Sequence, residues 1–327
     1  MNELTLVAES ESNLVLAKLA ERAVHYIGKH LADSTKRAYA KDYKSYSAWC
    51  ETLEVQPIPA SPEVVAIYIA MLTDAGFSVS TIERALASIA KAHQVKDFQF
   101  PRKHNLVQQA LKGAKRTIGV RPNQVDAVTP EDLRAMVKDL DSDIRGVRNR
   151  ALLTLGFAGG FRRSEIVALD MEDINKTEAG YVVLLRRSKT DQEGEGREVG
   201  IPYGSSLETC PVRSLDTWIE LRKMFDEDGT GPLICGVSPK GDTILPNHRL
   251  NARTVARTVA TAAHSVGLTG HYAGHSLRAG LVTAAAKAGK PAHVIQEQTG
   301  HKSIDMIMRY IRREAIFEEN AAAGIGL

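Results

Sequence analysis

The C-terminal sixty residues gather side chains that could act together on a phosphate group. His275 and Arg278 stand three residues apart, so an imidazole and a guanidinium would share one face if this stretch is helical. Further along, His301 precedes Tyr310 by nine residues. Arginine and histidine bind phosphate oxygens, and a tyrosine hydroxyl can serve as a nucleophile. This set of residues indicates phosphate chemistry.

Two basic residues upstream could belong to the same site. Arg162 follows the double glycine at 159 and 160, and Lys189 lies in the polar segment 188–196. Taken singly, each candidate has a plainer explanation. An arginine after such a turn is more often a surface residue, a hairpin lysine usually only solvates its loop, and His275 could be a capping or core histidine.

Helical periodicity bears on whether Tyr310 belongs to the core. Ile304, Ile307, Met308 and Ile311 would form one apolar stripe on the final helix. Tyr310 falls about 100° from the centre of that stripe at the rotation of an α-helix. The pattern therefore predicts that Tyr310 flanks the core instead of filling it.

The spacing of His271 and His275 matches that of a metal-binding pair, but the supporting residues are missing. No glutamate follows His271, and the sequence offers no evident third ligand. We therefore predict no metal site here.

Composition places the chain among globular proteins. It has 327 residues, of which 43% are hydrophobic and 25% charged, with a net charge of +3. No apolar run approaches the roughly 18 residues of a membrane span, and the first residues do not resemble a signal peptide. Three widely spaced cysteines favour a reduced chain without disulfides or structural zinc. We expect a cytoplasmic protein that acts away from membranes.

The pattern of helix signals predicts two domains that are both mainly α-helical. Residues 1–30 would form an arm and a first helix, 31–116 a helical bundle, 117–128 a linker and 129–327 a second domain. Serine caps are predicted at Ser34, Ser61 and Ser80, and Thr129 opens the first helix of the second domain. Strands at 181–187 and 198–201 would form one small antiparallel sheet, with Lys189 in the hairpin between them.

The aromatic residues of the bundle have one interpretation, which is packing in the core, whereas its basic residues have two. Tyr43, Tyr46 and Trp49 recur at helical spacing, and we predict that they pack in the core. From Lys91 to Arg121, eight basic residues are opposed by a single acid, Asp97. This run is either a stripe that neutralises DNA phosphates or a surface that happens to be basic.

The motifs, taken in order, resemble the tyrosine recombinase (phage integrase) family, and within it Cre-type site-specific recombinases most of all. They are Gly160-Phe161-Arg162-Arg163-Ser164-Glu165, Lys189 in a hairpin, His275-Ser276-Leu277-Arg278, and Gly300-His301 followed by Tyr310. His301 departs from the Cre type, which has tryptophan there, but agrees with the wider family. The resemblance extends over the chain from about residue 30.

The resemblance implies a chemical role for each motif residue. Tyr310 would attack the scissile phosphorus and form a 3′-phosphotyrosine, while Arg162 and Arg278 hold the non-bridging oxygens. Lys189 would protonate the departing 5′-oxygen, and His275 would assist proton transfer from Tyr310. His301 would hydrogen-bond the phosphate. Glu165 would orient the site from a buried position, and no metal or other cofactor would be needed.

The resemblance also implies a fold and partners. A SAM-like core-binding domain and a catalytic domain would form a C-shaped clamp on double-stranded DNA with an inverted-repeat site. The residues after Asn320 would dock into a neighbouring protomer of a homotetramer assembled on two sites, which would recombine through a Holliday junction. Contacts to DNA are expected from basic residues of the bundle: Arg37, Lys41, Lys44, Arg84, Lys91, Lys112, Lys115 and Arg116. Arg37 and Arg84 are the better candidates for reading guanine.

Two other functions remain open at this stage. A type IB topoisomerase uses nearly the same residues to relax supercoils as a monomer. A non-catalytic DNA-binding or architectural protein could share the fold, although all six catalytic candidates are present here.

Overall fold

The computed structural model describes Leu19, Arg22 and residues 31–119, 125–186, 195–226 and 228–314. The chain divides into two compact units, Met1–Pro122 and Asn123–Leu327, and the division falls inside the expected linker 117–128. The predicted helix at 14–27 lies outside the described residues except for two positions. Lys189 and the tail from residue 315 lie outside them as well.

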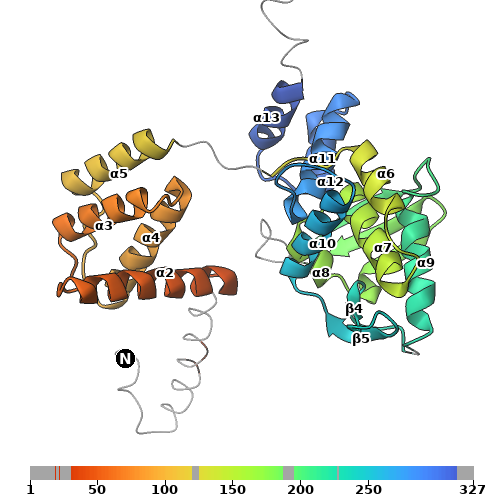
Figure 1. Ribbon diagram of the computed structural model, residues 1–327, viewed down its shortest axis with the longest axis horizontal. Coiled ribbons are helices and arrows are strands. Elements are labelled where there is room, and N and C mark those ends of the chain that lie inside the picture. The colour runs from red at the N-terminus through yellow and green to blue at the C-terminus, as the bar shows by residue number, and fades with distance from the viewer. Residues whose placement is uncertain are drawn as a thin grey trace, which may run out of the picture. The chain divides into compact units, whose positions relative to one another are not determined.

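The described part of the first unit is a bundle of helices, as predicted (Figure 1). These are α2 (Asp33–Thr52), α3 (Pro62–Asp74), α4 (Val79–Val95) and α5 (Asn105–Ile118). Tyr46 and Leu86 are fully buried between them, and the partly buried Tyr43 and Trp49 pack against the same cluster. The prediction that these three aromatic residues pack in the core is therefore confirmed.

Helix starts in this bundle follow local capping, with two exceptions to the prediction. Ser61 caps α3 and accepts a hydrogen bond from the Val64 amide, as predicted. The predictions that Ser34 and Ser80 cap helices were wrong. Helix α2 already begins at Asp33, after Ala32. In α4 the capping oxygen is that of Ser78, because its extended backbone lets the hydroxyl reach the Thr81 amide.

The second unit is also mainly helical. Its helices are α6 (Pro130–Lys138), α7 (Ile144–Ala158), α8 (Arg163–Ala168), the 3₁₀-helix η2 (Met171–Asp173), α9 (Pro211–Lys223), α10 (Ala252–Ser265), α11 (Gly274–Lys287), α12 (Ala292–Thr299) and α13 (Ile304–Glu314). Helix α6 starts with the predicted cap, in which the Thr129 hydroxyl and the Asp132 carboxylate each bond the other residue's amide.

Small antiparallel sheets complete this unit. Strands β1 (Ile174–Thr177), β2 (Gly180–Leu185) and β3 (Arg197–Pro202) form one sheet, and β4 (Cys235–Val237) pairs with β5 (Ile244–Arg249) in another. The predicted hairpin is β2–β3, but the expectation of a single two-stranded sheet was wrong. Strand β1 is a short, mostly exposed edge, and β4 has three residues, so neither shows an apolar alternation that sequence could reveal.

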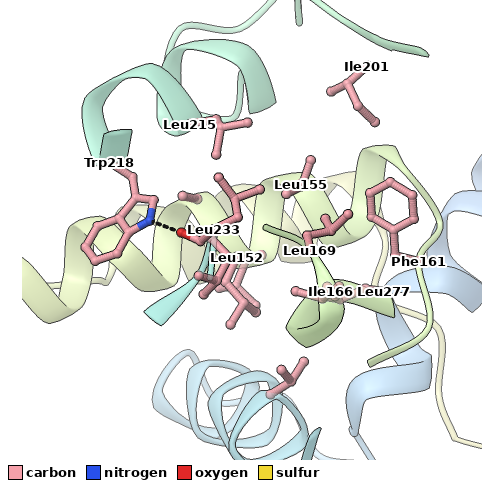
Figure 2. Packing of buried hydrophobic residues seen from close by; sticks show 14 of the residues in the cluster. Leu152, Leu155, Phe161, Ile166, Leu169, Ile201, Leu215, Trp218, Leu233 and Leu277 are labelled. Atoms are coloured by element: carbon pink, nitrogen blue, oxygen red, sulfur yellow. Dashed lines mark hydrogen bonds between the residues drawn. The ribbon is translucent and has the colours of Figure 1, made fainter. Parts of the chain in front are cut away.

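The core of the second unit lies along α7. Leu152 and Leu155 are fully buried, together with Phe161 and with Leu277 of α11 (Figure 2). Trp218 of α9 donates its ring N–H to the Leu233 carbonyl at 2.8 Å. These contacts fix the turn after α7 and the start of α11, which are the two places where the predicted arginines lie.

The last three helices share a smaller cluster beside this core. Val282 of α11, Ile295 of α12 and Ile307 of α13 are buried together, and Tyr310 packs against them while only partly buried. Tyr310 therefore flanks this cluster, as its helical position predicted. Ile304 of the predicted apolar stripe is 42% exposed, so that part of the prediction was wrong. No helix in the described part of the chain is both long and apolar enough to cross a membrane. All three cysteines are buried free thiols.

Candidate active site

Arg162 is held at the start of α8 by Glu165. The Arg162 guanidinium donates to Glu165 Oε1 at 2.6 Å, and the Arg162 amide donates to Glu165 Oε2 at 2.8 Å. Glu165 is buried, as predicted, and Arg162 is only 9% exposed. A second guanidinium nitrogen, Nη2, donates to the Gly300 carbonyl at 3.3 Å. One carboxylate therefore sets both the backbone and the side chain of this arginine.

Arg278 reaches the same place from α11. Its Nη1 donates to the carbonyl oxygens of Gly160, at 2.8 Å, and of Thr299. Gly160 adopts φ +57°, a conformation that glycine accepts readily, and the chain turns there so that its carbonyl faces the arginine. Burial, reinforced by the nearby charge of Arg162, lowers the pKa of Arg278 to about 10. Because this pKa is still well above 7, the guanidinium remains charged at neutral pH.

The second terminal nitrogen of Arg278 is the more informative one. Nη2 is buried and has no hydrogen-bond partner among the described residues. A buried charged donor without a partner is costly, and a bound anion would satisfy it. Arg278 is therefore set up to receive an oxyanion.

His301 follows the glycine that ends α12. Its Nδ1 lies 2.6 Å from the Thr299 hydroxyl, which also donates to the Ile295 carbonyl. Burial lowers the pKa of His301 to about 3, and the charges of Arg278 and Arg162 contribute to the same shift. The imidazole is thus neutral at physiological pH in the unliganded protein.

A third arginine, Arg197, lies at this site and was not among the predicted residues. It begins β3, and its Nη1 donates to the carbonyls of Glu297 at 3.1 Å and Gln298 at 3.0 Å. Burial lowers the pKa of Arg197, Glu165 opposes this shift and Arg162 adds to it. Sequence carries no signal for this role, because a basic residue at the start of a strand normally faces water.

A cavity of about 340 Å³ opens beside these side chains and contains the predicted nucleophile. It is lined by His275, Arg278, His301 and Tyr310, together with apolar residues that include Val282. His275 is otherwise exposed at the start of α11. Four of the six predicted catalytic residues therefore share one cavity, and Arg162 bonds the carbonyl of Gly300, the residue before His301.

Lys189 lies outside the described residues, but the two ends of its segment are placed. Leu185, the last residue of β2, pairs with Arg197, the first residue of β3. Arg197 in turn contacts the end of α12. The base of the hairpin that carries Lys189 is therefore attached to the same helix end as His301.

The predicted DNA-contact residues lie in the first unit, and their side chains are exposed or half-buried. Three of them already have partners. Arg84 forms a two-pronged bond with Asp42, at 2.7 and 3.1 Å, Lys115 pairs with Glu83, and Lys91 bonds Gln94. The other five make no ion pair with the described residues: Arg37, Lys41, Lys44, Lys112 and Arg116. Because the Arg84 guanidinium already donates two hydrogen bonds to Asp42, Arg84 would have to release Asp42 before it could bind a DNA base.

Metal ligands do not gather in the described part of the chain. No group of three or more His, Cys, Asp or Glu side chains is arranged there to hold an ion. The positive charge at the site comes instead from Arg162, Arg197 and Arg278, whose guanidiniums converge on the carbonyl end of α12.

Comparison with known proteins relates this chain to integrases and recombinases. Residues 126–315 match the model of the phage integrase family. The chain is 35% identical, over 309 residues, to an integrase/recombinase xerD homolog of Selenomonas ruminantium, covering 93% of this chain and 89% of that protein. It is 25% identical to the recombinase cre of Escherichia phage P1, covering 82% and 81% of the two chains.

A solved structure shares the fold. The Tn1549 transposon integrase in complex with transposon right end DNA superposes with a TM-score of 0.62 at 17% identity, covering 91% of this chain and 98% of that one.

Proposed function

The chain belongs to the phage integrase family of tyrosine recombinases, and on that premise we propose that it exchanges DNA strands at specific sites through a 3′-phosphotyrosine intermediate. The observation that carries the proposal is the cavity that brings Tyr310 together with Arg278, His275 and His301. A nucleophile, fixed positive charge and proton-transfer groups within one cavity suit attack on a phosphodiester.

Charge stabilisation comes first in the proposed mechanism. Nucleophilic attack places additional negative charge on the non-bridging oxygens of the phosphate. Arg278 offers a buried Nη2 without a partner, and Arg162 is held rigid by Glu165. Guanidiniums that are already oriented need little rearrangement as this charge develops, so they stabilise the transition state more than they stabilise bound DNA.

Proton transfers accompany the attack. The Tyr310 oxygen bonds to phosphorus, and its proton passes to His275. The bond from phosphorus to the 5′-oxygen breaks, and Lys189 protonates that oxygen to give a free 5′-hydroxyl. The phosphodiester energy is kept in the tyrosine–phosphate bond. A 5′-hydroxyl from a second duplex reverses the steps, and one such exchange yields a Holliday junction.

His301 has a distinct part in this scheme. Its ring is neutral without DNA because of burial and the surrounding arginines. A bound phosphate adds negative charge that favours the protonated ring, which can then donate to a phosphate oxygen. The site thus gains a proton as it gains its substrate.

Pairing of protomers is proposed through the C-terminal tail. The residues after Asn320 include Ile325 and Leu327, and they lie outside the described residues. A largely apolar groove of about 770 Å³ in the second unit has walls from α6, α7, β2, β3, α11 and α12, and Phe157, Leu281 and Val294 line it. We assign this groove to the tail of a neighbouring copy, which would link four protomers in a cycle on two DNA sites.

DNA binding is proposed for both units. The exposed basic side chains of the first unit supply phosphate contacts. Of the two arginines expected to read guanine, Arg37 is the better candidate, because it makes no ion pair with the described residues whereas Arg84 is bonded to Asp42. Each unit would contribute contacts to the duplex, and an inverted-repeat site would receive one protomer on each repeat.

A nicked suicide duplex tests the proposal. The target site is first selected by the wild-type protein from a pool of random duplexes, and the nick then lets the short cleaved fragment diffuse away and traps the covalent complex. We expect a protein–DNA adduct with the wild type and none with Tyr310→Phe, although both bind the duplex equally. Absence of an adduct with the wild type on its selected site would refute the proposed function.

A further inference from the structure

We propose that Arg197 is a positioning residue that fixes Gly300 and His301 for the reaction by clamping the carbonyl end of α12. This inference rests on the proposed function, since it names what His301 needs in order to act. Arg197 is a half-buried residue of β3, outside the motifs that the sequence offered.

The clamp acts on groups that a helix leaves unsatisfied. The last carbonyl oxygens of an α-helix have no partner within the helix and carry the negative end of its dipole. Arg197 Nη1 bonds two of them, those of Glu297 and Gln298. Arg278 takes the next, that of Thr299, and Arg162 takes that of Gly300. Of the four carbonyls immediately before His301, half are therefore held by Arg197.

Close packing against Gly300 completes the clamp. Gly300 ends α12 with φ +64°, and its amide bonds the Gln296 carbonyl. A Cβ at this position would lie 2.8 Å from Arg197 Nε and 3.0 Å from Cζ. The guanidinium therefore covers the side of Gly300 where a side chain would project, which restricts how the chain can leave the helix toward His301.

Arg197 differs from Arg278 in its relation to the cavity. Arg278 lines the cavity that contains Tyr310, whereas Arg197 is absent from that lining. The Arg197 atoms Nε and Nη2 are buried and have no hydrogen-bond partner among the described residues. Because they lie out of solvent and outside the cavity, Arg197 acts through the backbone that carries His301 and does not bind the scissile phosphate itself.

The clamp also joins two parts of the reaction. Arg197 pairs with Leu185 across the β2–β3 ladder, and the segment between these two residues carries Lys189. The same side chain is bonded to the end of α12. The β2–β3 ladder, from which the Lys189 segment leaves, and the end of α12, which precedes His301, are therefore both bonded to Arg197.

Hydrogen exchange tests the clamp without DNA. Amide exchange is followed by mass spectrometry in a peptide spanning residues 296–303. We expect faster exchange in Arg197→Ala than in the wild type, and no change in Glu198→Ala, which alters the exposed neighbour on the same strand. Arg197→Lys keeps the charge but has a single ammonium group, so it should give an intermediate rate. Equal exchange in the wild type and in both Arg197 variants would overturn the proposal.

Cleavage of the selected nicked duplex tests the positioning role. We expect Arg197→Ala to slow adduct formation by about 100-fold, as displacement of a catalytic group by about 1 Å can do, with duplex affinity unchanged. In a His301→Ala background the same change should cost less than about 3-fold, because residues that act through one another are not additive. Arg197→Lys should recover part of the rate.

The possible results separate this proposal from the proposed function. An additive loss in the double variant, or a normal rate in Arg197→Ala, would show that Arg197 does not act through His301. If the wild type forms no adduct, the proposed function fails, and the exchange measurement still decides whether Arg197 holds Gly300 and His301. If Arg197→Ala does not fold, Arg197→Lys serves for both measurements.

Discussion

The hydroxyl oxygen of Thr299 lies 2.6 Å from Nδ1 of His301, and the same hydroxyl donates to the Ile295 carbonyl. A hydroxyl has one hydrogen, so with that hydrogen on Ile295 the oxygen can only accept from the ring. We therefore expect the neutral imidazole to carry its proton on Nδ1, which leaves Nε2 as an acceptor. One buried threonine thereby sets both the orientation and the tautomer of His301.

Thr299→Val should remove this control while preserving shape. We expect adduct formation to slow by about 10- to 100-fold, the range usual when the partner that orients a functional histidine is lost. Thr299→Ser keeps the hydroxyl and should retain most of the rate. The rate is measured under single-turnover conditions on the selected nicked duplex, and a valine variant as fast as the wild type would show that His301 needs no such partner.

The low pKa of His301 predicts how stability depends on pH. In the unfolded chain this imidazole takes up a proton near pH 6.5, but in the folded protein only near pH 3. Its contribution to stability is therefore fully present above pH 6.5 and is lost as pH falls toward 3. Denaturant unfolding at pH 7, 5 and 4 should show a steeper loss in the wild type than in His301→Gln. His264→Gln, at an exposed histidine, serves as the control and should follow the wild type.

Removal of the Glu165 charge should destabilise the second unit. Glu165 is almost fully buried and is bonded to Arg162 at 2.6 Å. Glu165→Gln keeps the shape but removes the carboxylate charge that faces Arg162, and loss of one partner of a buried pair typically costs about 3 kcal/mol or more. Urea unfolding measures the change, with Glu198→Gln as an exposed control. An unfolding free energy equal to that of the wild type would mean that water or other groups already compensate Arg162.

The bond between Arg84 and Asp42 predicts unequal roles for two arginines of the bundle. Arg84 gives up a two-pronged ion pair if it binds DNA, whereas Arg37 makes no ion pair with the described residues. We expect Arg37→Ala to weaken binding of the selected duplex by about 1–3 kcal/mol, and Arg84→Ala to weaken it less. Titrations at one fixed salt concentration measure both. A larger loss from Arg84→Ala would show that DNA displaces Asp42.

Truncation after Asn320 should separate cleavage from assembly. Without its tail, the protein should still form the covalent adduct on one site but should fail to recombine two sites. Val294→Asp, which places a charge in the proposed groove at a residue that is 42% exposed, should have the same effect. Val95→Asp, at an exposed position of the first unit, is the matched control. Unchanged recombination by the truncated protein would show that the tail is not needed for assembly on two sites.

Sequence by itself determined the features that depend on neighbours in the chain. The caps at Ser61 and Thr129 were predictable because each side chain bonds an amide three residues away. The flanking position of Tyr310 followed from helical periodicity alone. The family resemblance likewise rests on residue types at short spacings, and the match over residues 126–315 bears it out.

Tertiary structure alone decided how those residues meet. The bond from Arg278 to Gly160 spans 118 positions, and the bonds from Arg197 to α12 span about a hundred. No local pattern encodes such contacts, because they depend on how α7, α11 and the β2–β3 ladder pack around one core. Local chemistry therefore identified the reacting groups, whereas packing at long range brought Arg197 against the end of α12 that precedes His301.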